Sequence, residues 1–273
     1  MAYLNNALSL LKATSRTFFI PISLLPAGLQ EAVTSAYLCM RAIDQIEDHP
    51  GLDNALKAKL LRSISFRLQA GHGQSRPQDF APVPGPDLAQ LEEVSLRIGE
   101  WALLAPPTIA PRIWDATAAM ADRMASWADC NWQVNTEADL DCYTFSVAGA
   151  VGLLLSDLWA WHDNTQTSRA QAIGFGRGLQ SVNILRNYQE DRGRGVDFFP
   201  DGWGVEDMQH YAHRNLALGE VYTKNLAPGP AKTFCSIPLA LAQGTLEALS
   251  SGREKLSRDD VISIISKLVP LAS

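Results

Sequence analysis

The sequence has no excess of positive charge and no cysteine pattern. Its 273 residues include 23 lysines and arginines against 29 aspartates and glutamates, which gives a formal net charge of −6. Nucleic-acid-binding proteins usually carry a basic surface, so this balance argues against a nucleic-acid partner. The four cysteines show neither CxxC nor zinc-ligand spacing. We interpret them as buried thiols in a reducing compartment.

Long apolar runs and targeting signals are also missing. No uninterrupted apolar run reaches the roughly 18 residues that span a bilayer. The start, Met1–Asn6, is polar, and no cleavage pattern follows it, so no signal peptide is indicated. We therefore expect a soluble cytoplasmic protein, which apolar substrates could still bring into peripheral contact with a membrane.

Alternation of apolar and polar residues is scarce and no internal repeat is visible, so the sequence predicts no strand. Helical periodicity and punctuation by Gly and Pro predict helices instead, over residues 4–14, 29–47, 53–71, 88–104, 111–131, 140–161, 168–191, 205–215, 232–251 and 258–268. With 47% hydrophobic residues, the chain can bury a substantial core. We predict an all-α helical bundle in a single domain spanning residues 1–273.

The predicted helix over 168–191 carries a row of oxygen-bearing side chains near its end. Asn183, Asn187 and Asp191 are spaced i, i+4 and i+8, so they share one face of the helix. Their immediate neighbours in the sequence are largely apolar, and we expect this face to point inward.

The predicted helix over 29–47 ends in a comparable cluster, formed by Arg41, Asp44, Glu47 and Asp48. Charges that face a core are costly unless they are paired or bind a cation. Two facing helices with such rows would hold oxygen ligands suited to Mg²⁺, which commonly bridges to substrate phosphates. The alternative is a salt-bridge network with Arg41 and Arg186.

Such a metal site has a specific use in diphosphate chemistry. Mg²⁺ would grip a diphosphate and neutralise the charge that develops as it leaves, and arginines would add charge-assisted hydrogen bonds. Departure from an allylic carbon leaves a carbocation, which needs a dry pocket with aromatic faces. Candidate aromatic residues are Phe18, Phe19, Tyr37, Tyr143, Phe145 and Phe234.

Five segments, in the same order, resemble motifs of the squalene/phytoene synthase family of isoprenoid enzymes: TSRTFF, AYLCMRAIDQIED, DCYTFSVAGAVG, LQSVNILRNYQEDRGRGVDFFP and TFCSIP. The resemblance covers nearly the whole chain, and the first acidic motif is closer to the squalene synthase form. It implies an isoprenoid-synthase helical bundle with a central apolar cavity. It also implies Mg²⁺-dependent transfer of a prenyl group from a prenyl diphosphate.

The resemblance also implies roles for single residues. The implied metal ligands are Asp44, Glu47, Asp48, Asn183, Asn187 and Asp191. The implied contacts to diphosphate are Ser15, Arg16, Arg41, Gln180 and Arg186. Tyr143 would lie near the cation and join Asp44, Asp48 and Asp191 as a catalytic residue, in a pocket lined by Phe18, Tyr37 and Phe234.

One residue departs from the family pattern: Asn187 stands where the second acidic motif normally has an aspartate. Asparagine can still ligate Mg²⁺ through its carbonyl oxygen, but it brings one negative charge fewer. Three functions therefore stay open. The enzyme couples two prenyl diphosphates head to head, as is usual in the family; or it uses a single diphosphate to prenylate an aromatic small molecule or to cyclise the chain; or the protein is a non-catalytic binding or assembly protein of this fold.

Overall fold

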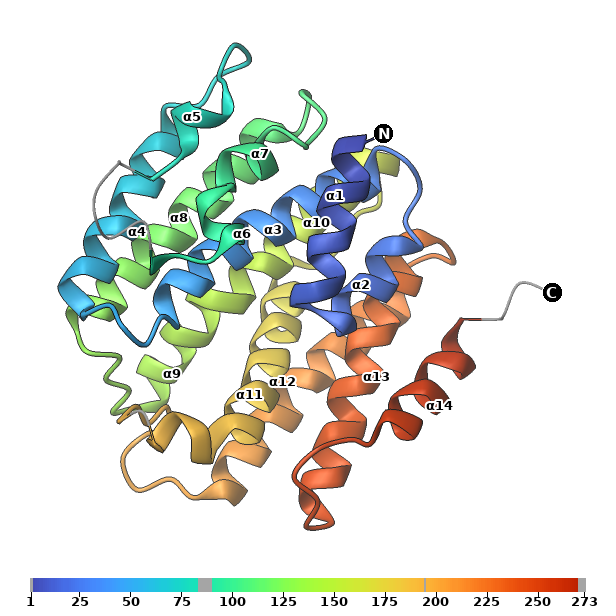
Figure 1. Ribbon diagram of the computed structural model, residues 1–273. Helices are drawn as coiled ribbons and strands as arrows, with labels where there is room; N and C mark the ends of the chain where they lie inside the picture. The colour runs from blue at the N-terminus through green and yellow to red at the C-terminus, as the bar shows by residue number, and fades with distance from the viewer. Residues whose placement is uncertain (1, 83–89, 194, 270–273) are drawn as a thin grey trace. The chain divides into compact units, whose positions relative to one another are not determined.

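The computed structural model describes residues 2–82, 90–193 and 195–269, and all regular structure in these ranges is helical (Figure 1). The prediction of an all-α fold is confirmed. The interpretation of the cysteines as buried holds for Cys39 and Cys235 and is wrong for Cys130 and Cys142, which are exposed. The helices form two compact units, residues 1–132 and residues 133–273. The single domain over 1–273 and the central cavity both depend on how the two units pack together, so they stay predictions.

The first unit is built around a long helix, α3. Its described helices are α1 (Ala2–Thr14), α2 (Arg16–Ser23), α3 (Leu29–Glu47), α4 (Asn54–Gln69), α5 (Pro77–Phe80), α6 (Glu93–Leu96), α7 (Ile98–Ala102) and α8 (Ala110–Asp129). Helix α3 contacts α1, α4, α6, α7 and α8, and Leu38, Ile43 and Ile46 on it are fully buried. This burial fixes the helix whose last turn carries the predicted acidic cluster.

The prediction of one continuous helix over residues 88–104 is wrong. Residues 88 and 89 lie outside the described part, and the remainder forms the two short helices α6 and α7. The hydroxyl of Ser95 donates to the carbonyl of Ala42 at 2.7 Å. A side-chain carbon at Gly99 would lie only 1.8 Å from the carbonyl oxygen of Pro77. These tertiary contacts set the local path and override helical propensity.

The second unit contains one long helix with a π turn inside it. Its elements are α9 (Glu137–Thr144), the π turn η2 (Phe145–Gly149), α10 (Ala150–Asp163), α11 (Arg169–Gly193), α12 (Val205–Asn225), α13 (Pro230–Ser250) and α14 (Arg258–Leu268). Helix α12 extends ten residues beyond the predicted 205–215, whereas the bounds of α11, α13 and α14 agree with the prediction to within a few residues.

The continuous helix Glu137–Asp163 is long and apolar enough to cross a membrane by length and composition. Counting only uninterrupted apolar residues did not reveal this. Only 33% of its apolar window is buried, whereas the core helix of a soluble protein is mostly buried. One such helix among the described residues is weak evidence for a membrane span. The cytoplasmic location stays a prediction.

Glycines let α11 approach its neighbours at backbone distance. A side-chain carbon at Gly152 of α10 would lie 2.2 Å from the carbonyl oxygen of Ala172, and one at Gly176 of α11 would lie 2.3 Å from that of Ala148. Both distances are far below a van der Waals contact, and the obstacles are backbone atoms that cannot rotate away. The small residues of VAGAVG therefore serve close helix packing.

This packing predicts the effect of a single methyl group. Gly176→Ala should lower the free energy of unfolding by about 1–3 kcal/mol, the usual cost of overpacking a core. Gly193→Ala, at the end of the same helix with nothing within 4 Å of the added carbon, should change it by less than about 0.5 kcal/mol. Urea unfolding followed by circular dichroism measures both variants, and equal stabilities would contradict the packing argument.

Candidate functional site

The last turn of α3 gathers three carboxylates. Asp44 and Glu47 lie on the helix, and Asp48 caps its end with its backbone N–H donating to the carbonyl of Asp44 at 2.9 Å. One carboxylate oxygen from each residue lies within 4.8 Å of the others, and all three side chains are half-buried. The prediction that these residues share one face is confirmed. Such a set of hard oxygen donors fits a divalent cation such as Mg²⁺.

Electrostatics in this cluster favour a bound cation. Burial, and after it the neighbouring charge of Asp48, raise the pKa of Asp44 from 3.8 to about 6, although Arg41 forms an ion pair with Asp44 and opposes the shift. Because the folded protein holds this proton more tightly than the unfolded chain, Asp44 lowers stability as the pH rises from about 4 to about 6. The side chain of Asp44 keeps 32% of its accessible area, so solvent and ions reach it and weaken the effect.

One N–H group of the Arg41 side chain lacks a hydrogen-bond acceptor in the described part of the chain. Its Nη1 pairs with Asp44, whereas its Nε is buried and has no hydrogen-bond partner among the described residues. A buried donor without an acceptor is costly, and it is suited to an anionic ligand. The predicted salt-bridge alternative is therefore present at one pair, but this pair does not use the whole guanidinium.

The predicted TSRTFF segment forms the start of α2, beside Tyr37. The hydroxyl oxygen of Ser15 caps α2 by accepting from the N–H of Phe18 at 3.2 Å, and Ser15 is also hydrogen-bonded to Tyr37. The rings of Phe18 and Tyr37 lie 5.7 Å apart between centroids. Burial raises the pKa of Tyr37, on which the charges of Arg41 and Asp44 also act. The first unit thus brings together all its predicted site residues whose side chains are described; that of Arg16 lies outside the described part.

The second predicted row lies on α11 and only partly faces inward. Asp191 is buried, Asn187 is half-buried, and Asn183 is exposed. The prediction of an inward face is therefore wrong for Asn183. A residue four positions along an α-helix is rotated by about 40°, so a row in steps of four winds around the helix. Since this row belongs to the second unit, its joint use with α3 stays a prediction.

Polar contacts link the exposed part of this row to its neighbours on α11. The side-chain amide of Asn183 donates to Gln180 at 3.5 Å, a long contact. The Nε of Arg186 donates to the side-chain oxygen of Asn187 at 3.2 Å. The predicted diphosphate contacts Gln180 and Arg186 therefore lie next to the predicted ligands.

Tyr143 lies under the segment that follows α11. It is 3% exposed and stacks on Phe198, with ring centroids 4.4 Å apart. The next residue, Phe199, stacks on Tyr188 of α11 at 4.2 Å. The stacking of Phe198 on Tyr143 and of Phe199 on Tyr188 was not predicted, although the FF pair before a proline was a visible signal. Phe234 is buried beside Trp159, with ring centroids 5.4 Å apart.

Comparison with known proteins identifies the family of this chain. The squalene/phytoene synthase family model matches residues 11–263. The chain is 30% identical over 274 residues to the squalene synthase of Schizosaccharomyces pombe, covering 88% of this chain and 58% of that protein. It is 28% identical to squalene synthase ERG9 of Saccharomyces cerevisiae, over 93% of this chain and 63% of that protein. The chain thus spans about three fifths of the length of these relatives.

Solved structures support the fold. A ligand complex of TcSQS aligns with a TM-score of 0.80 at 21% identity, covering 100% of this chain and 88% of that one. A dehydrosqualene synthase in complex with a ligand aligns with a TM-score of 0.70 at 16% identity, covering 98% and 95%. These structures show the same fold. The family model over residues 11–263 shows the family: the chain belongs to the squalene/phytoene synthase family.

Proposed function

We propose that the protein is a Mg²⁺-dependent prenyltransferase. It ionises an allylic prenyl diphosphate and couples the carbocation to a second prenyl diphosphate, head to head, as squalene and phytoene synthases do. The observation that carries this proposal is the set of three carboxylates within 4.8 Å of one another beside Arg41, at the end of the buried helix α3. Family membership supplies the reaction class.

In this proposal Asp44, Glu47 and Asp48 would hold the metal, whose charge would stabilise the departing diphosphate. The unpartnered Nε of Arg41 donates to a diphosphate oxygen. Further oxygen ligands come from α11, and further contacts to diphosphate come from two segments. These residues are Asn183, Asn187, Asp191, Ser15, Arg16, Gln180 and Arg186.

In this proposal, aromatic rings stabilise the carbocation once the diphosphate has left. The ring of Tyr143, held against Phe198, presents a π face that stabilises positive charge without attacking it. Phe18, Tyr37 and Phe234 line the pocket and exclude water, which would otherwise quench the cation.

Asn187 favours a second candidate function within the same chemistry. Its oxygen accepts from Arg186, and its neutral amide leaves one negative charge fewer to balance Mg²⁺ than an aspartate would. A site that binds a single diphosphate binds fewer Mg²⁺ ions and therefore needs fewer metal ligands. Such an enzyme would prenylate an aromatic small molecule or cyclise the chain.

Neutralising the charge of one proposed metal ligand tests the proposal. Wild-type protein should release pyrophosphate from dimethylallyl, geranyl, farnesyl or geranylgeranyl diphosphate when Mg²⁺ is present and not when EDTA is added. Asp48→Asn should lower this rate by roughly 10²–10³-fold, the range found when a group that stabilises developing charge is removed. Asp115→Asn, an exposed acidic residue on α8, is the matched control and should keep the wild-type rate.

Full activity of Asp48→Asn would refute the metal assignment. Absence of release from any of these substrates by the wild-type protein would instead favour a non-catalytic binding protein of the same fold.

A charge-restoring substitution separates the two candidate functions. Asn187→Asp should raise the share of two-chain product, because the added carboxylate helps to balance the Mg²⁺ ions that a second diphosphate brings. Asn187→Ala, which removes the oxygen ligand, should lower it. Mass spectrometry of products from a panel of prenyl diphosphates, with and without aromatic acceptors, measures that share. Prenylated aromatic products from the wild-type protein, without two-chain products, would establish the alternative.

A further inference from the structure

The π turn η2 interrupts the long helix just after Tyr143. A π turn inserts one extra residue and often occurs at a functional site. Each residue of an α-helix adds about 100° of rotation, so the segment before the turn is rotated relative to the segment after it. The direction of Tyr143 therefore depends on how each of the two segments is fixed.

The segment after the turn is fixed by contact with the backbone of α11. A side-chain carbon at Gly152 of α10 would lie 2.2 Å from the carbonyl oxygen of Ala172, and one at Gly149, the last residue of the turn, would lie 3.2 Å from the side chain of Ile173. These contacts are steric and leave little freedom for α10 to rotate. They do not reach α9, which carries Tyr143.

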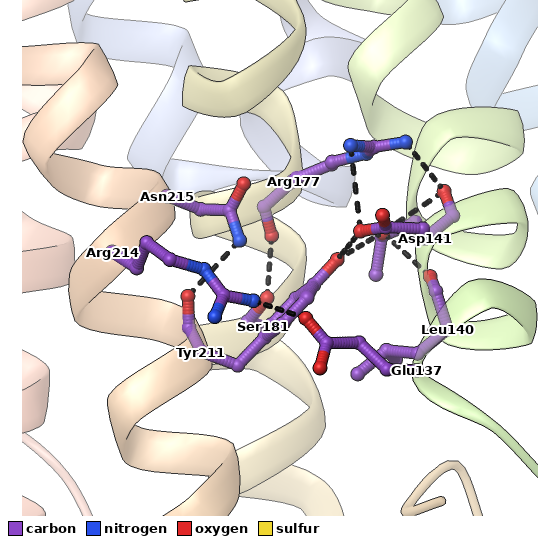
Figure 2. A network of polar contacts seen from close by, with 9 residues as sticks. Glu137, Leu140, Asp141, Arg177, Ser181, Tyr211, Arg214 and Asn215 are labelled. Atoms are coloured by element: carbon purple, nitrogen blue, oxygen red, sulfur yellow. Dashed lines mark hydrogen bonds and ion pairs between the residues drawn. The ribbon is translucent and has the colours of Figure 1, made fainter.

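The segment before the turn is fixed by a polar network on Asp141 (Figure 2). From α11, Arg177 pairs with the carboxylate of Asp141 at 3.3 Å, and its Nη2 donates to the backbone carbonyl of the same residue at 3.1 Å. From α12, the hydroxyl of Tyr211 donates to the carboxylate at 2.7 Å. Two neighbouring helices thus hold one residue of α9 by both its side chain and its backbone.

Tyr211 is held in position by its burial and by contacts with two other residues. It is 1% exposed, its hydroxyl lies 3.1 Å from that of Thr144, and its ring meets Trp203 edge-on with centroids 6.0 Å apart. Asp141 and Thr144 flank Tyr143 in the sequence. Asp141 precedes Tyr143 by two residues, so the two side chains are about 200° apart around the helix. The network therefore contacts α9 on the face away from the Tyr143 ring.

We propose that Asp141, Arg177 and Tyr211 are positioning residues, which set the rotation of α9 and so hold the Tyr143 ring against Phe198. The inference rests on the function proposed above, in which Tyr143 faces the carbocation. The ion pair is partly exposed, with 40% of the Asp141 side chain accessible, and such pairs contribute little to stability. Its place on α9, the segment just before the π turn, gives it an effect on orientation instead.

A matched pair of tyrosines on α12 tests this role. Tyr211 and Tyr222 are both buried, and each hydroxyl meets a hydroxyl of the long helix: Thr144 before the π turn at 3.1 Å, and Ser156 after it at 3.0 Å. Tyr211→Phe and Tyr222→Phe delete the same atom on opposite sides of the turn. We expect both variants to lose similar thermal stability.

Only Tyr211→Phe should disturb Tyr143. In full-length protein labelled with 3-fluorotyrosine, it should shift the ¹⁹F resonance of Tyr143, which is assigned with Tyr143→Phe. It should also lower kcat for pyrophosphate release by roughly 10-fold with little change in KM, because a small misplacement of a reacting group slows chemistry more than binding. Tyr222→Phe should leave both the Tyr143 resonance and kcat at the wild-type values.

If Tyr211→Phe leaves the Tyr143 resonance and kcat unchanged, or if Tyr222→Phe changes them equally, the positioning role is refuted. Should Tyr211→Phe fail to fold, Arg177→Gln removes the ion pair from the other side and should give the same shift. A wild-type protein without pyrophosphate release would refute the proposed function, and the ¹⁹F resonance would still decide whether the network orients Tyr143.

Discussion

The partial burial of three neighbouring carboxylates at the end of α3 is the constraint on which the proposed function depends. A folded chain avoids half-buried like charges unless something compensates them. Arg41 compensates part of this charge, but burial, and after it the charge of Asp48, still raise the pKa of Asp44. A divalent cation and the diphosphate that accompanies it would complete the balance, which ties ligand binding to the electrostatics of the fold.

The rest of each unit keeps its functional helix in place. In the first unit, α3 is anchored by its apolar face and by hydroxyl bonds such as that of Ser35 to the carbonyl of Trp101 at 2.7 Å. In the second, glycines bring α11 into backbone contact with α10, and the network on Asp141 fixes α9. Rigid support of this kind is what a reactive carbocation requires, since rings and ligands must be in place before it forms.

The sequence was sufficient wherever local periodicity decides the structure. The bounds of α3 follow from helical periodicity and the Gly and Pro residues around it, and the proximity of Asp44, Glu47 and Asp48 follows from their spacing. The sequence was insufficient where contacts between residues far apart in the chain determine the local structure. The split of α6 from α7 and the π turn depend on tertiary packing, and the partners of Asp141 come from residues 36 and 70 positions away. The exposure of Asn183 depends on how far α11 is covered, which spacing does not reveal.

The pKa of Asp44, measured by carboxyl ¹³C NMR and assigned with Asp44→Asn, tests the central claim most directly. Without metal, the account predicts a midpoint near pH 6, raised from 3.8. With Mg²⁺ and inorganic pyrophosphate added, the midpoint should fall, because a bound cation favours the ionised carboxylate. A midpoint near 3.8 that does not respond to Mg²⁺ and pyrophosphate would contradict the claim that this cluster is built to hold a metal.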